Sequence, residues 1–374
     1  MKVLLLTPFD TGNIGTILQA YATFSLIQEF GHDVKIAYYH YDSIQNPFLI
    51  SNLFKRGLKR YVGSVAGFLM RYPAKKKLWD FIRSHIDITE KVTKAGLAQL
   101  SKDYDFVIVG SDCVWNGEAF QLETAYLLDF VEDNRKKGNF ASSFACDDIG
   151  DDLRPIFSKY LSQFPTLSVR EVRGQQLIRE LTGKDSTVVL DPTLVRDSSF
   201  WDKIADESKL KFSGEYIFVA EYAVSAALMK DAEKLSQKYN LPVYCLYPPK
   251  GKIIKSKLFL QSGPEDVMQL IRNAKYVFTD SYHMMIFSIN FNKEFFAYKT
   301  PTNIPAISKY DSILGCLDLY ERLFDTQKKN ENDIDITSCT PINYGRVNSR
   351  LEEERKKSID YLKNLLQNAE KHFK

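Results

Sequence analysis

The N-terminal segment of the chain places a short apolar run directly before a glycine-bearing turn. Lys2 to Thr7 is apolar at its four central positions, which predicts a strand buried on both faces, as in a parallel sheet. The turn from Thr11 to Gly15 and an amphipathic stretch from Thr16 to Phe30 follow directly. A strand, a glycine turn and a helix in this order predict an α/β unit wound around a parallel sheet.

The same alternation continues along the chain in two series, separated by a polar, charge-rich passage at 196–213. The first series adds predicted strands at 34–39, 106–109, 140–145, 167–170 and 187–190, most of them far enough apart for right-handed helical crossovers. The second adds predicted strands and helices at 216–219, 226–239, 242–246, 265–274, 276–278 and 284–291. Two such series predict an α/β fold of two Rossmann-like doubly wound domains that face a cleft at the carboxyl ends of their sheets.

The length supports this division, because 374 residues at about 150 per domain predict two domains. We expect an N-terminal domain at 1–195, a linker at 196–213 and a C-terminal domain at 214–340. A capping helix is expected at 346–374, where apolar residues recur with a roughly helical period among many Lys and Glu. The N-terminal domain contains a basic insertion at about 43–79.

The charge and the cysteines exclude several classes of protein. Lys and Arg number 50 against 47 Asp and Glu, a net charge of +3, so we expect no nucleic-acid partner. The five cysteines are widely spaced and contain no C-x-x-C pair, which argues against a disulfide framework or a structural zinc site. No apolar stretch has the length of a signal peptide core or a membrane span. We therefore expect a cytoplasmic protein.

Two loops of the first domain contain candidate substrate-binding residues. In the loop with Asn13 and Gly15, glycine lets the backbone approach a ligand, and the following helix N-terminus favours an anion. The loop after Val109 contains Asp112, a candidate general base, with Trp115 and Asn116 as candidate sugar contacts. Each loop has a structural alternative: a tight turn selected for packing, and an aspartate that caps the next helix.

Two further loops supply a guanidinium and an imidazole. Arg170 follows an apolar strand and can grip a carboxylate or phosphate in fork geometry, although it could equally form a structural ion pair with Glu171. His283, preceded by Ser281, lies at a predicted helix N-terminus, where the dipole favours anions. A lone histidine is more often structural. Cys113 has no histidine near it in the sequence, so a thiol nucleophile is the less favoured interpretation. The absence of metal-binding motifs predicts no catalytic metal.

Five of these segments in this order resemble the polysaccharide pyruvyl transferase family, and they occupy residues 13–22, 109–116, 167–171, 190–194 and 279–292. The resemblance implies a fold like that of the GT-B glycosyltransferases. It also implies a reaction in which phosphoenolpyruvate donates its pyruvyl group to a sugar diol as a cyclic ketal and phosphate is released. The acceptor would be a surface polysaccharide such as a capsule or exopolysaccharide, or its lipid-linked precursor. The chain would bind it on the N-terminal domain and the donor on the C-terminal domain, without a cofactor or metal.

The resemblance also assigns roles to single residues. Arg170 and His283 would bind phosphoenolpyruvate, Met284 would offer its backbone, and Asp112 would be the catalytic base. Because ketal formation needs an acid across the donor from the base, we assign that role to His283. The chain departs from the family pattern at Cys113, where Gln is usual, at Met284-Met285, where Gly-Thr often follows the His, and at Ser308-Lys309, where an Arg is frequent. Lys309 would supply the missing cation.

Two alternatives remain open from the sequence. A nucleotide-sugar glycosyltransferase would keep the fold and change the donor. A catalytically silent scaffold is favoured if Met284 and Met285 close the donor pocket.

The basic insertion predicts contact with an anionic membrane surface. It contains eight basic residues without an acid, interleaved with aromatic and aliphatic side chains: Lys55, Arg56, Lys59, Arg60, Arg71, Lys75, Lys76 and Lys77. Such a segment would suit a lipid-linked acceptor. The alternative is a solvated helical insertion.

Overall fold

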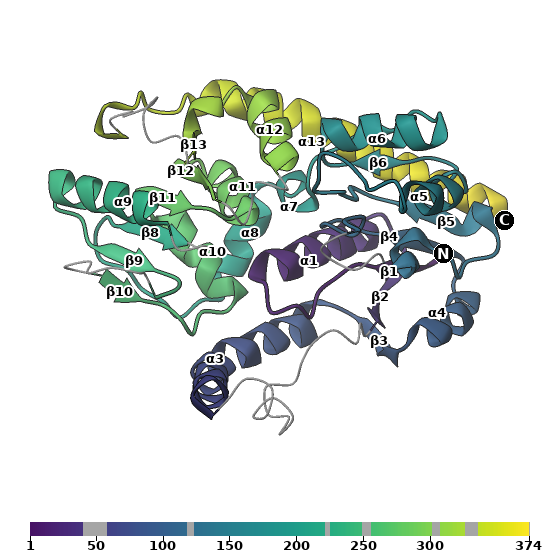
Figure 1. Ribbon diagram of the computed structural model, residues 1–374, viewed down its shortest axis with the longest axis horizontal. Helices are drawn as coiled ribbons and strands as arrows, with labels where there is room; N and C mark the ends of the chain where they lie inside the picture. The colour runs from purple at the N-terminus through teal and green to yellow at the C-terminus, as the bar shows by residue number, and fades with distance from the viewer. Residues whose placement is uncertain are drawn as a thin grey trace.

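The chain folds into two α/β lobes that lie side by side (Figure 1). The computed structural model describes residues 1–39, 58–117, 123–220, 225–248, 256–300, 307–325 and 336–373, with the backbone alone for 58–71. The lobes and their all-parallel main sheets confirm the predicted fold of two Rossmann-like units, although the predicted domain boundaries stay a prediction.

The first lobe is built on a five-stranded parallel sheet in the order β3-β2-β1-β4-β5. Its strands are β1 (Lys2–Leu6), β2 (Asp33–Tyr39), β3 (Ile88–Val92), β4 (Phe106–Val109) and β5 (Lys137–Asn139). Its first helices are α1 (Ile14–Glu29), α3 (Leu58–His85) and α4 (Lys94–Leu100), with 3-10 turns at Ser101–Asp103, Thr124–Leu127 and Asn134–Lys136. The central strands β1 and β4 are buried on both faces, which explains why their sequences are continuous apolar runs.

The strand predicted at 140–145 is wrong in its position. The strand β5 ends at Asn139, and the following segment is irregular, with Ala141 and Ala145 at positive φ. Single bridges run from Asp112 to Ser142 and from Ser142 to Val169, so this segment joins the main sheet to a two-stranded sheet of β6 (Ser168–Val169) and β7 (Thr187–Val188). The apolar side chains at 140–145 point into the hydrophobic core and are buried, although their backbone does not pair as a strand.

The second lobe is built on a six-stranded parallel sheet in the order β10-β9-β8-β11-β12-β13. Its strands are β8 (Ile217–Ala220), β9 (Val243–Cys245), β10 (Ser256–Leu258), β11 (Tyr276–Thr279), β12 (Glu294–Lys299) and β13 (Leu323–Asp325). Its helices are α9 (Ala226–Tyr239), α10 (Pro264–Asn273), α11 (Tyr282–Asn290) and α12 (Ile307–Leu317), with 3-10 turns at Tyr320–Arg322 and Ile336–Ser338.

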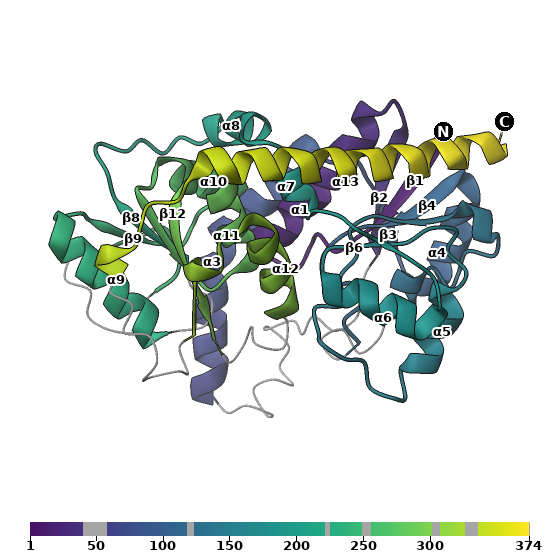
Figure 2. The same cartoon turned by 90° about the horizontal axis from the view of Figure 1, so that it is seen from above.

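The last helix connects the two lobes. Helix α13 (Tyr344–Phe373) runs along both of them (Figure 2). Its Arg355 donates to the Leu194 carbonyl and to Oδ1 of Asn290, which joins α7 (Pro192–Val195) to α11. The remaining helices are α5 (Arg154–Leu161), α6 (Val172–Thr182) and α8 (Ser198–Asp206). Besides the capping role expected of this segment, α13 therefore links α7 to α11, the two elements that flank the site described below.

One hydrophobic core passes from lobe to lobe. It includes Ile17 of α1, Trp201 of α8, Phe287 of α11 and Leu362 of α13, all buried. Within the described residues, no helix is long and apolar enough to cross a membrane. Lys55 and Arg56 of the basic insertion lie outside the described residues, as do the side chains of Lys59, Arg60 and Arg71.

Candidate functional site

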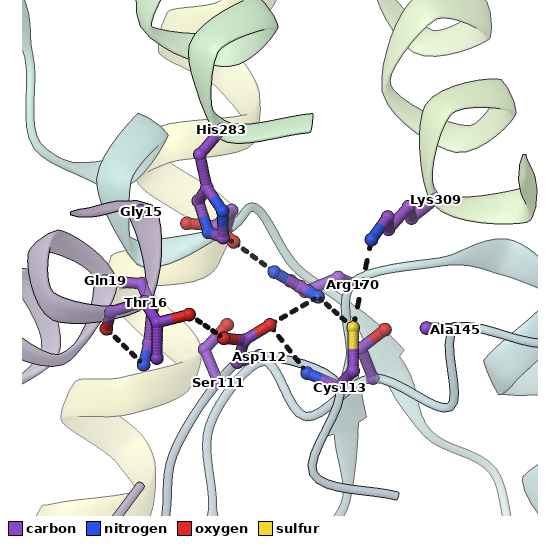
Figure 3. A network of polar contacts seen from close by, with 12 residues as sticks. Gly15, Thr16, Gln19, Ser111, Asp112, Cys113, Ala145, Arg170, His283 and Lys309 are labelled. Carbon is purple, nitrogen blue, oxygen red and sulfur yellow. Dashed lines mark hydrogen bonds and ion pairs between the residues drawn. The ribbon is translucent and has the colours of Figure 1, made fainter. Parts of the chain in front are cut away.

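Polar loops from both lobes meet at the carboxyl ends of their sheets. Asp112 follows β4, Arg170 follows β6, and His283 lies at the start of α11, just after β11. Figure 3 shows His283 and Lys309 reaching the cluster from α11 and α12, opposite Asp112 and Cys113. The structure thus brings together residues that are far apart in the sequence, at the edge where doubly wound folds bind their ligands.

Asp112 is held rigidly at the centre of this cluster. Its Oδ2 accepts a hydrogen bond from the Thr16 hydroxyl at 2.8 Å, and its Oδ1 accepts one from the Cys113 backbone N–H at 2.8 Å. Its φ of 77° is in the left-handed region, which aspartate and asparagine tolerate better than most residues. Burial alone would raise the pKa of Asp112, but His283, Arg170, the Thr16 hydrogen bond and Lys309 outweigh it and lower the pKa to about 2. The carboxylate is therefore ionised at neutral pH.

Arg170 is buried against a carboxylate, although not the one that the sequence suggested. Its side chain is 1% exposed, and its Nη1 pairs with Oδ2 of Asp191. Its Nη2 lies 3.9 Å from Oδ1 of Asp112, and its guanidinium lies over the Tyr282 ring. Glu171 does not pair with it: its Oε1 instead accepts bonds from the Ser143 hydroxyl and from the next two backbone N–H groups. The structural ion pair between Arg170 and Glu171 is therefore wrong as an interpretation.

Asp191 joins the arginine to the histidine. Its Oδ2 faces Arg170 and lies 3.7 Å from Nε2 of His283, while its Oδ1 accepts from the backbone N–H and hydroxyl of Thr193 at 3.0 and 2.7 Å. Those two bonds cap α7, where Pro192 occupies the first turn. This N-cap aspartate therefore neutralises the buried Arg170 and fixes the positions of its guanidinium and of the His283 ring.

His283 is buried, and its Nε2 has no hydrogen-bond partner among the described residues. Burial lowers the pKa of the imidazole, opposed by the charges of Asp191 and Asp112 and aided by those of Arg170 and Lys309. The ring packs directly on Gly15: a Cβ added at Gly15 would lie 2.4 Å from Cγ and Nδ1 of the imidazole. The backbone of Gly15 thus approaches the His283 ring of the other lobe, whereas its predicted approach to a ligand stays a prediction.

We expect Gly15→Ala to destabilise the fold through this contact. Overpacking of this kind costs about 1–3 kcal/mol, and chemical denaturation of the purified variant measures it. The loss should be largely relieved in the double variant Gly15→Ala/His283→Ala, because removing the ring makes room for the methyl group. Gly345→Ala is the matched control, since the nearest atom there is a side-chain oxygen 3.3 Å away. Additive effects in the double variant would contradict the contact.

Lys309 and Cys113 complete the cluster. Nζ of Lys309 and Nη2 of Arg170 each lie 3.8 Å from Sγ of Cys113. Lys309 also lies over the Tyr282 ring, 5.3 Å from its centre. Among the described residues, Asp112 and Asp191 pair with Arg170 and His283, and Lys309 forms no ion pair with either of these carboxylates. Two cations therefore converge on one small volume, a suitable arrangement for a small anionic ligand.

The other predicted contacts have different surroundings. Trp115 is 1% exposed, packs on Phe144 and donates from its indole N–H to the Tyr126 carbonyl, so its face is covered and a role as a sugar platform is wrong. The Asn116 side chain donates to the Ala145 carbonyl at 3.1 Å and so holds the loop. Asn13 caps α1 by accepting from the Gly15 N–H at 2.9 Å.

The start of α11 leaves backbone N–H groups without helical acceptors. The first bond of the helix runs from the Met285 N–H to the Ser281 carbonyl, so the N–H groups of Tyr282, His283 and Met284 precede it. The Ser281 side chain makes no capping bond. The side chains of Met284 and Met285 are buried in the hydrophobic core.

Sequence reasoning missed Thr16 and Asp191 as members of the site. Thr16 follows Gly15 in the first turn of α1, and Asp191 stands in one of the five motif segments; position in a motif was the available signal for both. Among the described residues, no three His, Cys, Asp or Glu side chains are grouped to hold a metal ion.

Comparison with known proteins gives a family and a fold. The family model described as polysaccharide pyruvyl transferase matches residues 13–300. No curated protein sequence matches the chain.

Among solved structures, the UDP-GlcNAc 2-epimerase from Methanocaldococcus jannaschii is similar over 94% of this chain and 92% of its own, with 11% identity and a TM-score of 0.50. The wall teichoic acid polymerase TagF covers 100% and 90% of the two chains, with 9% identity and a TM-score of 0.47. A putative UDP-N-acetylglucosamine 2-epimerase from Listeria monocytogenes covers 94% of each, with 10% identity and a TM-score of 0.46. At these identities the first structure shows the fold alone, which is GT-B-like.

Proposed function

The chain belongs to the polysaccharide pyruvyl transferase family, and from this premise we propose that it transfers the pyruvyl group of phosphoenolpyruvate to a saccharide diol and releases phosphate. The observation that supports this best is the convergence of Arg170 and Lys309 beside an ionised Asp112 and a buried His283. Such a set offers cations for a small polyanion together with a base and a proton-carrying ring.

In the proposed complex, the donor's phosphate and carboxylate are held by positive charge from both lobes. Arg170 offers Nη2, because Nη1 is occupied by Asp191, and Lys309 offers Nζ. The backbone N–H groups at the start of α11, including that of Met284, add the positive end of a helix dipole, and Ser281 adds a hydroxyl. A donor bound there would touch both lobes.

The chemistry then requires a base and an acid that face each other across the donor. An acceptor hydroxyl attacks C2 of phosphoenolpyruvate and gives its proton to Asp112, while the methylene carbon receives a proton from His283. A second hydroxyl displaces phosphate from the same carbon, gives its proton to His283 and closes the cyclic ketal, and Asp112 passes its proton to the leaving phosphate. Thr16 and the Cys113 N–H hold Asp112 in position for this, and Asp191 orients His283.

The donor itself would adjust both groups to their tasks. In the free protein the cations keep the pKa of Asp112 at about 2, which makes it a weak base, while burial keeps His283 neutral at pH 7. The negative charges of phosphoenolpyruvate offset Arg170 and Lys309, so they raise the pKa values of both groups. With the donor bound, Asp112 becomes a stronger base. A larger fraction of His283 is then protonated at pH 7 and able to act as the acid.

We therefore expect the pKa of His283 to lie below 6.5 in the free protein and to rise when phosphoenolpyruvate binds. NMR titration of the histidine rings measures this, with the resonance assigned by its absence in His283→Gln and the other four histidines as internal references. Because the protonated ring is the proposed acid, kcat should fall as pH rises above the pKa of the complex. An unchanged or lower pKa in the complex would contradict the assignment.

Release of phosphate from phosphoenolpyruvate in the presence of a saccharide acceptor tests the function. We expect release that depends on added galactosides or lipid-linked oligosaccharides and is matched by a ketal in the product. Turnover of a nucleotide-sugar donor instead would support the glycosyltransferase alternative. Binding of neither donor would support a silent scaffold.

Contact with a membrane surface is a separate proposal. Lys75 and Lys76 at the described end of the basic insertion are exposed on α3, consistent with a basic surface there. We propose that this segment binds anionic lipid near a lipid-linked acceptor. Co-sedimentation with anionic vesicles at low salt tests it, and absence of binding would remove it.

A further inference from the structure

The sulfur of Cys113 lies at the point where the two cations of the site converge. Sγ is 3.8 Å from Nη2 of Arg170 and 3.8 Å from Nζ of Lys309 (Figure 3). The backbone of Cys113 is fixed, because its N–H donates to Oδ1 of Asp112 at 2.8 Å. The thiol is half-buried, so it is neither sealed in the core nor freely exposed. An anion held between the two cations on this side would therefore lie beside the sulfur.

The groups around the thiol have unused capacity for an anion. Nε of Arg170 and Nε2 of His283 have no hydrogen-bond partner among the described residues, and their side chains are 1% and 10% exposed. Asp191 occupies only Nη1 of Arg170, and Thr16 and a backbone N–H engage the two oxygens of Asp112. On the side of Cys113, therefore, the nearest group to Nη2 of Arg170 and Nζ of Lys309 in this cluster is a thiol and not a carboxylate.

We propose that Cys113 is a modification site for small anionic electrophiles, such as α-halocarboxylates and epoxide phosphonates. Arg170 and Lys309 hold the anionic group, which places the neighbouring electrophilic carbon at Sγ. The sulfur–carbon bond forms as the carbon–halogen or epoxide carbon–oxygen bond breaks; halide leaves, or the alkoxide takes up a proton, and the thiol proton passes to solvent. The adduct keeps its anionic group between the two cations and blocks the site.

Selectivity for this thiol comes from recruitment of the anion and not from an activated sulfur. Burial raises the pKa of the Cys113 thiol, with Lys309 and Arg170 opposing and Asp112 aiding that rise. Neutral reagents should therefore react slowly here. A converging pair of cations raises the local concentration of an anion by about 10-fold or more. Comparing two reagents with the same leaving group cancels the thiolate fraction and isolates this charge effect.

The test compares iodoacetate with iodoacetamide, with labelling of each cysteine followed by mass spectrometry. Exposed Cys316 of the same chain is the internal reference. We expect the ratio of the iodoacetate rate to the iodoacetamide rate to be about 10-fold or more higher at Cys113 than at Cys316. Inorganic phosphate should slow carboxymethylation of Cys113 and leave that of Cys316 unchanged. Equal ratios at the two cysteines, or no protection by phosphate, would overturn the proposal.

Two variants separate charge from access. Lys309→Gln should lower the ratio at Cys113 by several-fold, because the iodoacetate rate loses both thiolate and anion recruitment while the iodoacetamide rate loses thiolate alone. Lys102→Gln, at an exposed position outside the cluster, should leave the ratio unchanged. A protein carboxymethylated at Cys113 should no longer be stabilised by phosphate in thermal unfolding. The proposal needs an anion site but not phosphoenolpyruvate as donor. Protection by phosphate without protection by phosphoenolpyruvate would support the modification site and count against the proposed donor.

Discussion

Arg170→Ala should lower the rate of pyruvyl transfer by well over about 100-fold, the scale expected when an electrostatic contact to the reacting group is removed. Arg170 contacts or approaches Asp191, Asp112 and Cys113 together, so its loss removes a cation proposed to bind the donor and also loosens the cluster. Steady-state phosphate release with a saturating acceptor measures the change.

The alanine variant also leaves a buried carboxylate without its partner. The Asp191 side chain is fully buried, and breaking a buried ion pair costs about 3–5 kcal/mol, so Arg170→Ala is expected to be less stable. Arg170→Lys keeps the charge and separates the two effects: it should fold better and still lose most of its activity, because an ammonium cannot bridge Asp191 and the donor at once. The exposed Arg179, replaced by alanine, is the control. Near-normal turnover in Arg170→Lys would show that the two-pronged guanidinium of Arg170 is not needed for the reaction.

Asp112→Asn should also lose well over about 100-fold in kcat, the range of a general base. Asparagine is the right replacement, because it tolerates the positive φ of this position, its amide oxygen can accept from the Cys113 N–H, and its NH2 group can donate to the Thr16 hydroxyl oxygen. The fold should therefore persist while the base is lost. Circular dichroism and single-turnover kinetics on the same sample measure both, and fully exposed Asp151→Asn is the control.

The pH dependence of stability gives a second readout for Asp112. Its pKa in the fold, about 2, is below its usual 3.8, so the ionised group stabilises the protein above pH 3.8 and this contribution is lost as pH falls toward 2. The stability difference between the native protein and Asp112→Asn should shrink over that range. Retention of kcat in Asp112→Asn would exclude it as the base, whatever the stability data show.

Much of the fold followed from local pattern. The continuous apolar runs that form β1 and β4 are those of strands buried on both faces, and the predicted strand at 276–278 lies within β11. The apolar residues at 140–145 misled the same reasoning, because burial and strand pairing leave the same apolar signature. The backbone N–H groups of Phe144 and Ala145 donate to Glu171, which lies 27 and 26 positions away in the sequence.

In the site too, the sequence identified some residues, whereas the surroundings of others depend on packing. Asp112, Arg170 and His283 could be selected from the sequence, because a polar residue directly after a buried parallel strand must lie at the carboxyl edge of its sheet. Trp115 could not be judged, because its covered face depends on packing against Phe144.

The partners of these residues were decided by tertiary structure alone. Spacing in the chain does not show that Arg170 pairs with Asp191 and not with adjacent Glu171, or that Gly15 of one lobe packs on His283 of the other. Strand and helix patterns depend on neighbours within a few positions, so one chain segment contains them. Charge pairing, burial and pKa depend on distances of a few ångströms between segments, and those distances exist only after both lobes have folded and docked.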